Sequence, residues 1–213
     1  FGSDDGFFYV VNAMRGQLYW KTNIYSPVRS TPYVAEELVY FGTEGGQILG
    51  LELGAGKPKW QVKTQRAVTS SPKVADDIVY VGSADGNVYA MDASSGWPIW
   101  RFATGGPIVS TPVLLEDTLF IGSADGHLYA IDITRGRQLW SHPTNGQVVS
   151  APAIWGNTVY FGSTDGSIYG VSTRRGELQW RFDVGSPIIG APNILNGVLY
   201  VGATDHCLYA LPL

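Results

Sequence analysis

Hydrophobic residues in this chain form short runs separated by polar turns, and the pattern of runs returns every forty residues. The period has no insertion or deletion along the chain, and it is marked by Trp20, Trp60, Trp100, Trp140 and Trp180, by Pro32, Pro72, Pro112, Pro152 and Pro192, and by Gly2, Gly42, Gly82, Gly122, Gly162 and Gly202. A fixed period of this length is typical of repeated supersecondary units that share one continuous core.

Each unit has the pattern of four short strands. Residues 76–92 contain two runs of β-branched and aromatic residues joined by Ser-Ala-Asp-Gly, which predicts a hairpin whose turn requires positive φ at Gly86. The same reading gives strands A (108–114), B (118–122), C (127–132) and D (137–142) in one repeat. No segment shows a 3.6-residue apolar period, so a helical solenoid is rejected.

Four antiparallel strands in about forty residues are the blade of a β-propeller. The sequence therefore predicts an all-β fold, a propeller of four-stranded antiparallel blades, with residues 1–213 as a single propeller. The proline of strand A fits this fold because proline is confined to edge strands, and strand A is the edge beside the central channel. The tryptophan of strand D would cover the neighbouring blade, burying about 150–250 Å².

The number of blades stays open. The N-terminal segment supplies a C strand (7–12) and a D strand (18–21), and the C-terminal segment supplies strands A, B and C. The chain is either a five-bladed ring with one surplus strand or a piece of a larger ring. We favour the second, because the chain starts inside a hairpin.

Composition narrows the class of partner. Hydrophobic residues make up 45% and charged residues 15% of the chain, which excludes disorder. The net charge of −4 provides no basic stripe for nucleic acid or an anionic membrane surface. No apolar run is long enough to span a membrane. The single Cys207 permits neither a disulfide nor a cysteine metal cluster. We expect a protein or a small ligand at the propeller face or channel.

Residues 89–100 and 129–140 resemble the tryptophan-docking motif of the PQQ-like, or quinoprotein-like, β-propeller repeat family. The motif reads Ala-x-Asp-x-x-Thr-Gly-x-x-x-Trp, and its positions are filled by Ala90, Asp92, Ser95, Gly96 and Trp100, by Ala130, Asp132, Arg135, Gly136 and Trp140, and more loosely in the other repeats. The resemblance covers essentially the whole chain. It implies that the five repeated tryptophans stack on the main chain of the adjacent blade.

Residues that repeat in every unit are weak candidates for chemistry. In the predicted propeller a ring of carboxylates would be formed by Asp5, Asp85, Asp125, Asp165 and Asp205, but Asp-Gly is what the turn itself favours, and Gly45 breaks the ring. His127, His142 and His206 lack metal-ligand spacing and are expected in surface or turn roles. Ser30, Ser70, Ser110 and Ser150 are expected to satisfy channel-side backbone. We therefore predict no catalytic, cofactor-binding or metal-binding residue, and no cofactor.

Residues that break the repeat are better candidates for binding. Arg29 replaces threonine, valine or isoleucine at its position in strand A, and Arg66 lies in the next D–A connection. Two cations near the channel mouth could hold an acidic ligand, but ordinary surface charge is the favoured explanation. Trp97 and Trp155 lie on turns outside the repeat, where exposed aromatics would indicate a protein or sugar contact.

The favoured function is a non-catalytic binding, scaffold or sensor propeller outside the cytoplasm. The resemblance includes outer-membrane assembly lipoproteins and extracytoplasmic sensor domains of bacterial membrane kinases, both of which use the propeller as a recognition surface. A quinoprotein dehydrogenase fragment is the first alternative. Such enzymes carry an adjacent-cysteine disulfide and a calcium ion held by Glu, Asn and Asp, which a chain with one cysteine lacks. A carbohydrate-binding propeller is the second alternative.

Overall fold

The computed structural model describes residues 1–213 as two compact units, Phe1–Ala103 and Thr104–Leu213. Every regular element is a β-strand. The first unit contains β1 (Phe7–Val11), β2 (Leu18–Asn23), β3 (Tyr33–Ala35), β4 (Leu38–Gly42), β5 (Gln47–Glu52), β6 (Pro58–Lys63), β7 (Lys73–Ala75), β8 (Ile78–Gly82), β9 (Asn87–Asp92) and β10 (Pro98–Ala103). No helix has the length and apolarity needed to cross a membrane.

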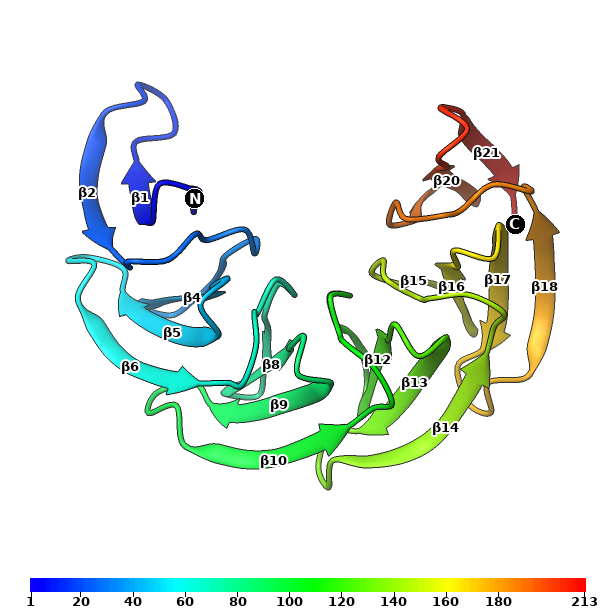
Figure 1. The fold of residues 1–213 in the computed structure, drawn as a ribbon, viewed down its shortest axis with the longest axis horizontal. Coiled ribbons are helices and arrows are strands. Elements are labelled where there is room, and N and C mark those ends of the chain that lie inside the picture. The colour runs from blue at the N-terminus through cyan, green and yellow to red at the C-terminus, as the bar shows by residue number, and fades with distance from the viewer. The chain divides into compact units, whose positions relative to one another are not determined.

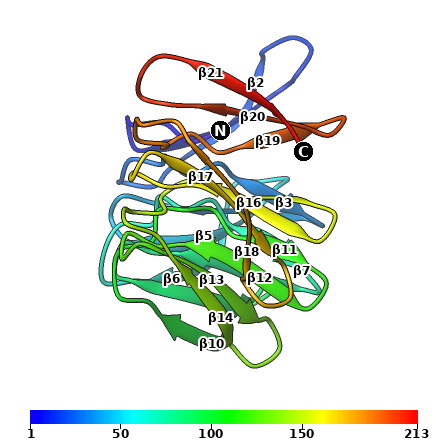
Figure 2. The same ribbon diagram turned by 90° about the vertical axis from the view of Figure 1, so that its right-hand side faces the viewer.

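The second unit contains β11 (Val113–Leu115), β12 (Thr118–Gly122), β13 (His127–Asp132), β14 (Arg137–Pro143), β15 (Ala153–Trp155), β16 (Thr158–Gly162), β17 (Ser167–Ser172), β18 (Leu178–Asp183), β19 (Asn193–Leu195), β20 (Val198–Gly202) and β21 (Leu208–Pro212). Each sheet is an antiparallel meander of consecutive strands, and in Figure 2 the strands β16, β17 and β18 can be followed side by side.

The sheets match the four-strand prediction. The first unit has the two-stranded sheet β1-β2 and the four-stranded sheets β3-β4-β5-β6 and β7-β8-β9-β10 (Figure 1). The second unit has the four-stranded sheets β11-β12-β13-β14 and β15-β16-β17-β18, followed by the three-stranded sheet β19-β20-β21. The hairpin turn is also as predicted, since φ at Gly86 is 85°.

Strand A is shorter than predicted. The sequence predicted a strand over 108–114, but β11 covers only Val113–Leu115. Pro112, just before β11, has no N–H for a ladder. The Ser110 hydroxyl instead accepts the Gly122 N–H at 3.2 Å, so a side chain replaces the backbone partner there.

A β-bulge lies at the start of every D strand. In the pairing of β5 with β6, Leu51 faces Pro58 and Gly50 faces Trp60, so Lys59 is an extra, unpaired residue. The same shift leaves one extra residue in each of the other D strands, namely Tyr19, Ile99, Leu139 and Gln179. A bulge re-aims the side chains around it. Here it directs the extra residue outward and the following tryptophan inward.

The cores lie between successive sheets within each unit. One cluster joins the second and third sheets of the first unit through Tyr40, Trp60 and Met91, all buried. An equivalent cluster of the second unit is built around Phe120, Trp140 and Phe161. Short strands thus gain their stability from side chains packed against the neighbouring sheet rather than from the ladder alone.

One core hydroxyl has no hydrogen-bond partner. Tyr80 is fully buried, and burial raises its pKa to about 12, with a smaller contribution from Asp76. At the equivalent position Tyr40 donates to the Ala93 carbonyl at 3.2 Å, and Phe120 has no hydroxyl.

Replacing Tyr80 by phenylalanine is therefore expected to stabilise the protein by about 1 kcal/mol, because an unpaired buried hydroxyl is unfavourable by about 1–3 kcal/mol. Tyr40→Phe is the matched control and should be neutral or destabilising, since it removes a hydrogen bond. Urea unfolding of both variants measures the difference. If Tyr80→Phe is the more destabilising of the two, the hydroxyl has a partner in solution.

Candidate functional site

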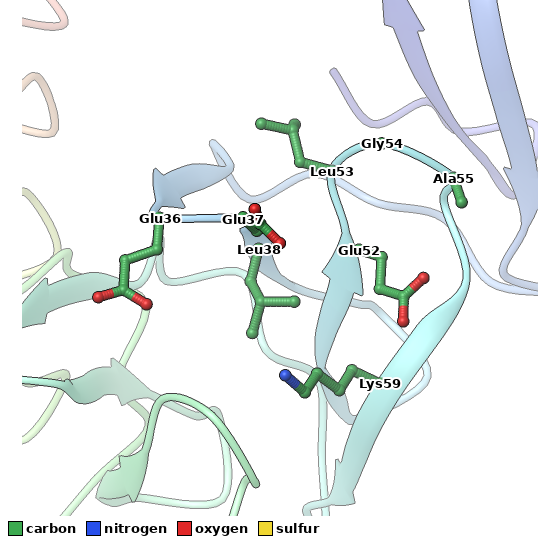
Figure 3. Close-up of a pocket in the computed structure, with 8 residues that line it drawn as sticks. All are labelled: Glu36, Glu37, Leu38, Glu52, Leu53, Gly54, Ala55 and Lys59. Atoms are coloured by element: carbon green, nitrogen blue, oxygen red, sulfur yellow. The ribbon is translucent and has the colours of Figure 1, made fainter.

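A groove in the first unit gathers unpaired charges around an apolar floor (Figure 3). Its volume is about 560 Å³, and it is lined by Glu36, Glu37, Leu38, Glu52, Leu53, Gly54, Ala55 and Lys59. The glutamates come from the turn between β3 and β4 and from the end of β5, and Lys59 is the bulge residue of β6. In Figure 3 Lys59 points from β6 toward Leu38.

Backbone hydrogen bonds hold the two acidic turns together. The Leu53 N–H donates to the Glu37 carbonyl at 2.8 Å, and the Gly56 N–H donates to the Glu52 carbonyl at 2.7 Å. The turn at Glu36 has positive φ, 51°. These bonds use main-chain atoms only, so the carboxylates of Glu36, Glu37 and Glu52 stay free for a ligand.

A second cavity continues the groove toward the next sheet of the same unit. It has a volume of about 380 Å³ and shares Glu36, Glu37, Leu38 and Lys59 with the first. It adds Tyr40, Asp77 and Asp92, among others. Burial raises the pKa of Tyr40, and the carboxylates of Glu36, Asp77 and Asp92 raise it further. The tyrosine hydroxyl therefore lies in a negative potential.

The groove is strongly acidic and its charges are not balanced internally. Five carboxylates line the two cavities, from Glu36, Glu37, Glu52, Asp77 and Asp92, against one ammonium group, that of Lys59. The ion pairs of the structure all join other residues. Such a surface favours ligands that carry positive charge.

Arg29, predicted as a binding residue, already has two acidic partners. Its Nε donates to Asp4 Oδ1 at 2.9 Å, and its Nη1 donates to Glu44 Oε1 at 3.2 Å. The hydrogen bond and charge of Asp4, together with the charge of Glu44, raise the pKa of this guanidinium. An acidic ligand would have to displace these carboxylates. Arg66 is exposed and makes no ion pair with Asp4 or Glu44.

The two predicted aromatic candidates differ in exposure. Trp97 is 75% exposed and Trp155 is 46% exposed. Trp97 precedes β10 in the first unit, whereas Trp155, predicted on a turn, is the last residue of strand β15 in the second, so that part of the prediction is wrong. Neither lines the groove.

The repeated aspartates are part of the scaffold. Each accepts a hydrogen bond of 2.6–2.7 Å from the tyrosine four residues later, in Asp5–Tyr9, Asp85–Tyr89, Asp125–Tyr129, Asp165–Tyr169 and Asp205–Tyr209. The second repeat has Gly45 and Leu49 at these positions, so both partners are missing together. This agrees with the expectation that the aspartate serves its own turn.

These hydrogen bonds set the protonation of the aspartates. Burial alone would raise the pKa of Asp85, but hydrogen bonds from Asn87, Tyr89 and the Gln65 N–H outweigh it, and the pKa is lowered. The pKa values of Asp125 and Asp165 are lowered in the same way. Burial first, and the aspartate second, raises the pKa of Tyr89 to about 12.

The lowered values give a pH dependence of stability. A carboxyl whose pKa is lower in the folded state stabilises the protein above its unfolded pKa, about 3.9, and this stabilisation is lost as the pH falls through the folded value. We expect the free energy of unfolding to fall in that range for the wild type. In the Asp85→Asn, Asp125→Asn, Asp165→Asn triple variant it should be lower at neutral pH and fall less on acidification. Equal pH slopes for the two proteins would contradict the assignment.

The histidines and serines also have mostly structural contacts. His142 lies in strand β14 rather than in a turn, is half-buried, and its Nδ1–H donates to the Gly176 carbonyl at 2.9 Å. His127 bonds the Asp125 turn, and His206 occupies a turn position with φ of 69°. Ser30, Ser70 and Ser110 accept backbone N–H groups, as expected, whereas the Ser150 hydroxyl has no partner.

Comparison with known proteins decides the family. A family model described as outer membrane protein assembly factor BamB matches residues 1–71, 50–181 and 149–212. The chain belongs to this family. BamB-like chains carry the PQQ-like propeller repeat, so the recognised resemblance is confirmed. A search of curated protein sequences gave no match.

Solved structures agree with the BamB-like fold. BamB from Moraxella catarrhalis has a TM-score of 0.88 at 23% identity, covering 99% of this chain and 69% of that protein. The computationally designed Ika8 protein has a TM-score of 0.87 at 22% identity, covering 100% of this chain and 67% of the design. The quinohemoprotein alcohol dehydrogenase ADHIIG from Pseudomonas putida HK5 has a TM-score of 0.74 at 18% identity, covering 88% and 40%. At identities below 25%, these TM-scores establish a shared fold and no more.

The motif tryptophans of this BamB-like chain contact the following sheet within each unit. Trp20 Nε1 donates to the Leu53 carbonyl at 2.8 Å, and Trp60 Nε1 donates to the Ala93 carbonyl at 2.8 Å. In the second unit, Trp140 Nε1 donates to the Thr173 carbonyl at 3.0 Å. A methyl group at Gly56, Gly96 or Gly176 would collide with the indole of Trp20, Trp60 or Trp140, so glycine there admits the ring.

The acidic groove was not predicted from the sequence, although the sequence contains a signal for it. Strands A and B are joined by two acids in three successive repeats, Glu36-Glu37, Asp76-Asp77 and Glu116-Asp117, and by Gly156-Asn157 and Asn196-Gly197 in the next two. Asn-Gly is what such turns favour. The turn itself does not require acids at these positions. Their presence therefore indicates a role for the surface around the turn.

Proposed function

We propose that this chain is part of a non-catalytic, extracytoplasmic propeller of the BamB family that presents a recognition surface to a protein partner. Residues 1–213 belong to one propeller, and the repeated tryptophans Trp20, Trp60, Trp100, Trp140 and Trp180 hold its blades together. The observation that carries the proposal is that most repeated polar residues are hydrogen-bonded within the fold, whereas the charged residues of the groove make no ion pair. Repeated aspartates and most repeated serines are used in turns and strand ends, while the groove leaves unpaired charges at the surface.

The family match favours protein binding over catalysis. The matching model is described as an outer membrane protein assembly factor, and we place this chain in the same context, outside the cytoplasm. A sensor domain uses the same kind of surface. The exposed residues Arg66, Trp97 and Trp155 stay candidates for additional contacts.

A quinoprotein dehydrogenase is less well supported. The resemblance to such enzymes requires a calcium ion held by acidic and amide side chains and an adjacent-cysteine disulfide. The chain has only Cys207, and no three of its His, Cys, Asp and Glu side chains are grouped so as to hold a metal ion. The residues present do not fit the cofactor site.

Photo-crosslinking in cells of the source organism tests the proposal. A photoreactive amino acid at Lys59 should crosslink one envelope protein, and the same amino acid at Gln179, one of the two bulge positions of the second unit, should not. Identification by mass spectrometry and cell fractionation gives the partner and its compartment. A partner found only in the cytoplasm would contradict the proposal. So would quinone binding by the purified chain with calcium, followed by absorbance.

A further inference from the structure

We propose that the groove between β3–β6 and the A–B and C–D turns of the next sheet binds an extended basic segment of the partner, seating lysine or arginine side chains over Leu38 and Leu53. The inference rests on the proposed function and specifies the chemistry of the partner. The groove belongs entirely to the first unit.

The floor of the groove is suited to an aliphatic stem. Leu38 is 6% exposed at its base, Leu53 is half-buried, and Gly54 and Ala55 leave the wall low. Lysine and arginine side chains place their methylene groups on apolar surface and keep the charge at the rim. A basic residue can therefore pack its methylene groups on the apolar floor and place its charge beside the carboxylates of the rim. An acidic or purely apolar residue cannot do both.

The rim of the groove has one charged hydrogen-bond donor, Lys59, for three carboxylates. The carboxylates of Glu36, Glu37 and Glu52 take part in no ion pair, with Lys59 or with any other residue. Ionised carboxylates are acceptors only, whereas ammonium and guanidinium groups are donors only. A basic partner supplies the missing donors as charge-assisted hydrogen bonds.

The occupant is a segment rather than a metal ion or a single small cation. No three of these side chains are grouped so as to hold a metal ion. The cavities of about 560 and 380 Å³ are joined through shared residues, and in Figure 3 the carboxylates of Glu36 and Glu52 stand at opposite ends. A segment with basic residues at intervals reaches both ends, and the Tyr40 hydroxyl and Asp77 line the farther cavity.

The equivalent cavity of the second unit has a different charge balance. It is lined by Asp117, Thr118, Asp132, Thr134, Arg135 and Leu139, with a volume of about 360 Å³. Two acids there face one arginine, and leucine occupies the bulge position held by Lys59. The basic segment is therefore expected to choose the first-unit groove.

The test uses a fluorescein-labelled peptide of alternating lysine and alanine and the 213-residue chain, measured by fluorescence anisotropy. The triple variant Glu36→Gln, Glu37→Gln, Glu52→Gln is expected to raise Kd at least about tenfold, the effect of losing about 1.4 kcal/mol. Lys59→Gln removes the opposing charge and should lower Kd by about two- to fivefold.

The matched control removes the same charge elsewhere. Glu116→Gln, Asp117→Asn, Glu177→Gln lies in the second unit and should change Kd less than twofold. If it weakens binding as much as the groove triple, the attraction is a net-charge effect and the inference is wrong. If the wild type does not bind the peptide while Lys59 still crosslinks a partner, the basic chemistry is wrong and the proposed function survives. If the wild type neither binds the peptide nor crosslinks a partner through position 59, both the inference and the proposed function are wrong. Thermal melting verifies that each variant is folded.

Discussion

Replacing Trp60 by alanine is expected to lower the free energy of unfolding by about 3–5 kcal/mol, the range for a large aromatic removed from a packed core. Trp60 is 7% exposed, packs on Tyr40 with ring centroids 5.8 Å apart, and donates to the Ala93 carbonyl of the next sheet. Its loss leaves a cavity between two sheets and an unpaired carbonyl. Urea or guanidinium unfolding measures the change.

Trp97→Ala is the matched control for Trp60→Ala. Trp97 is 75% exposed and lies outside the repeat, so its loss should change stability by less than about 0.5 kcal/mol. Similar losses for the two variants would mean that indole area in general, rather than the contact between sheets, sets the stability.

Gly42→Ala is expected to destabilise the protein by more than about 2 kcal/mol, because overpacking forces backbone and side chains apart. A Cβ at Gly42 would overlap both the side chain and the carbonyl oxygen of Val68, and backbone cannot turn aside as a flexible side chain can. Gly122 has the same conflict with the side chain and carbonyl oxygen of Val148. Thermal unfolding or denaturant midpoints give the effect.

The chain contains its own control for the Gly42 prediction. Gly202 occupies the same repeat position, yet a Cβ there meets nothing within 4 Å. Gly202→Ala should therefore be neutral or slightly stabilising, since alanine reduces the freedom of the unfolded chain. If Gly42→Ala and Gly202→Ala behave alike, the close approach of Val68 does not exist in solution.

Much of the fold could be predicted because the repeat constrains it. Positive φ at Gly86 and the four-strand sheets follow from local sequence, and forty-residue spacing aligns the units. The short strand A could not be read, because the ladder partner of Gly122 is a serine hydroxyl rather than main chain. The pattern of hydrophobic residues does not show where a side chain, rather than the main chain, accepts a backbone hydrogen bond.

The candidate site was less predictable for a related reason. Arg29 was predicted as a binding residue because it departs from the repeat. Only the structure shows that Asp4 and Glu44 already pair with it. Glu36 and Glu52 are sixteen positions apart in sequence and share a groove because the turn after β3 lies beside the end of β5. The departure from Asn-Gly turns was a visible signal, whereas the lack of ion pairs was not.

Because each D strand has a bulge, one exposed residue can vary in evolution without changing the core. The extra residue takes no part in the ladder, and five repeats place five different side chains there, Tyr19, Lys59, Ile99, Leu139 and Gln179. One aromatic, one charged, two aliphatic and one amide side chain are thus compatible with the same sheet geometry. Each blade therefore has a position at which a single codon change can retune what the surface binds without disturbing the tryptophan beside it.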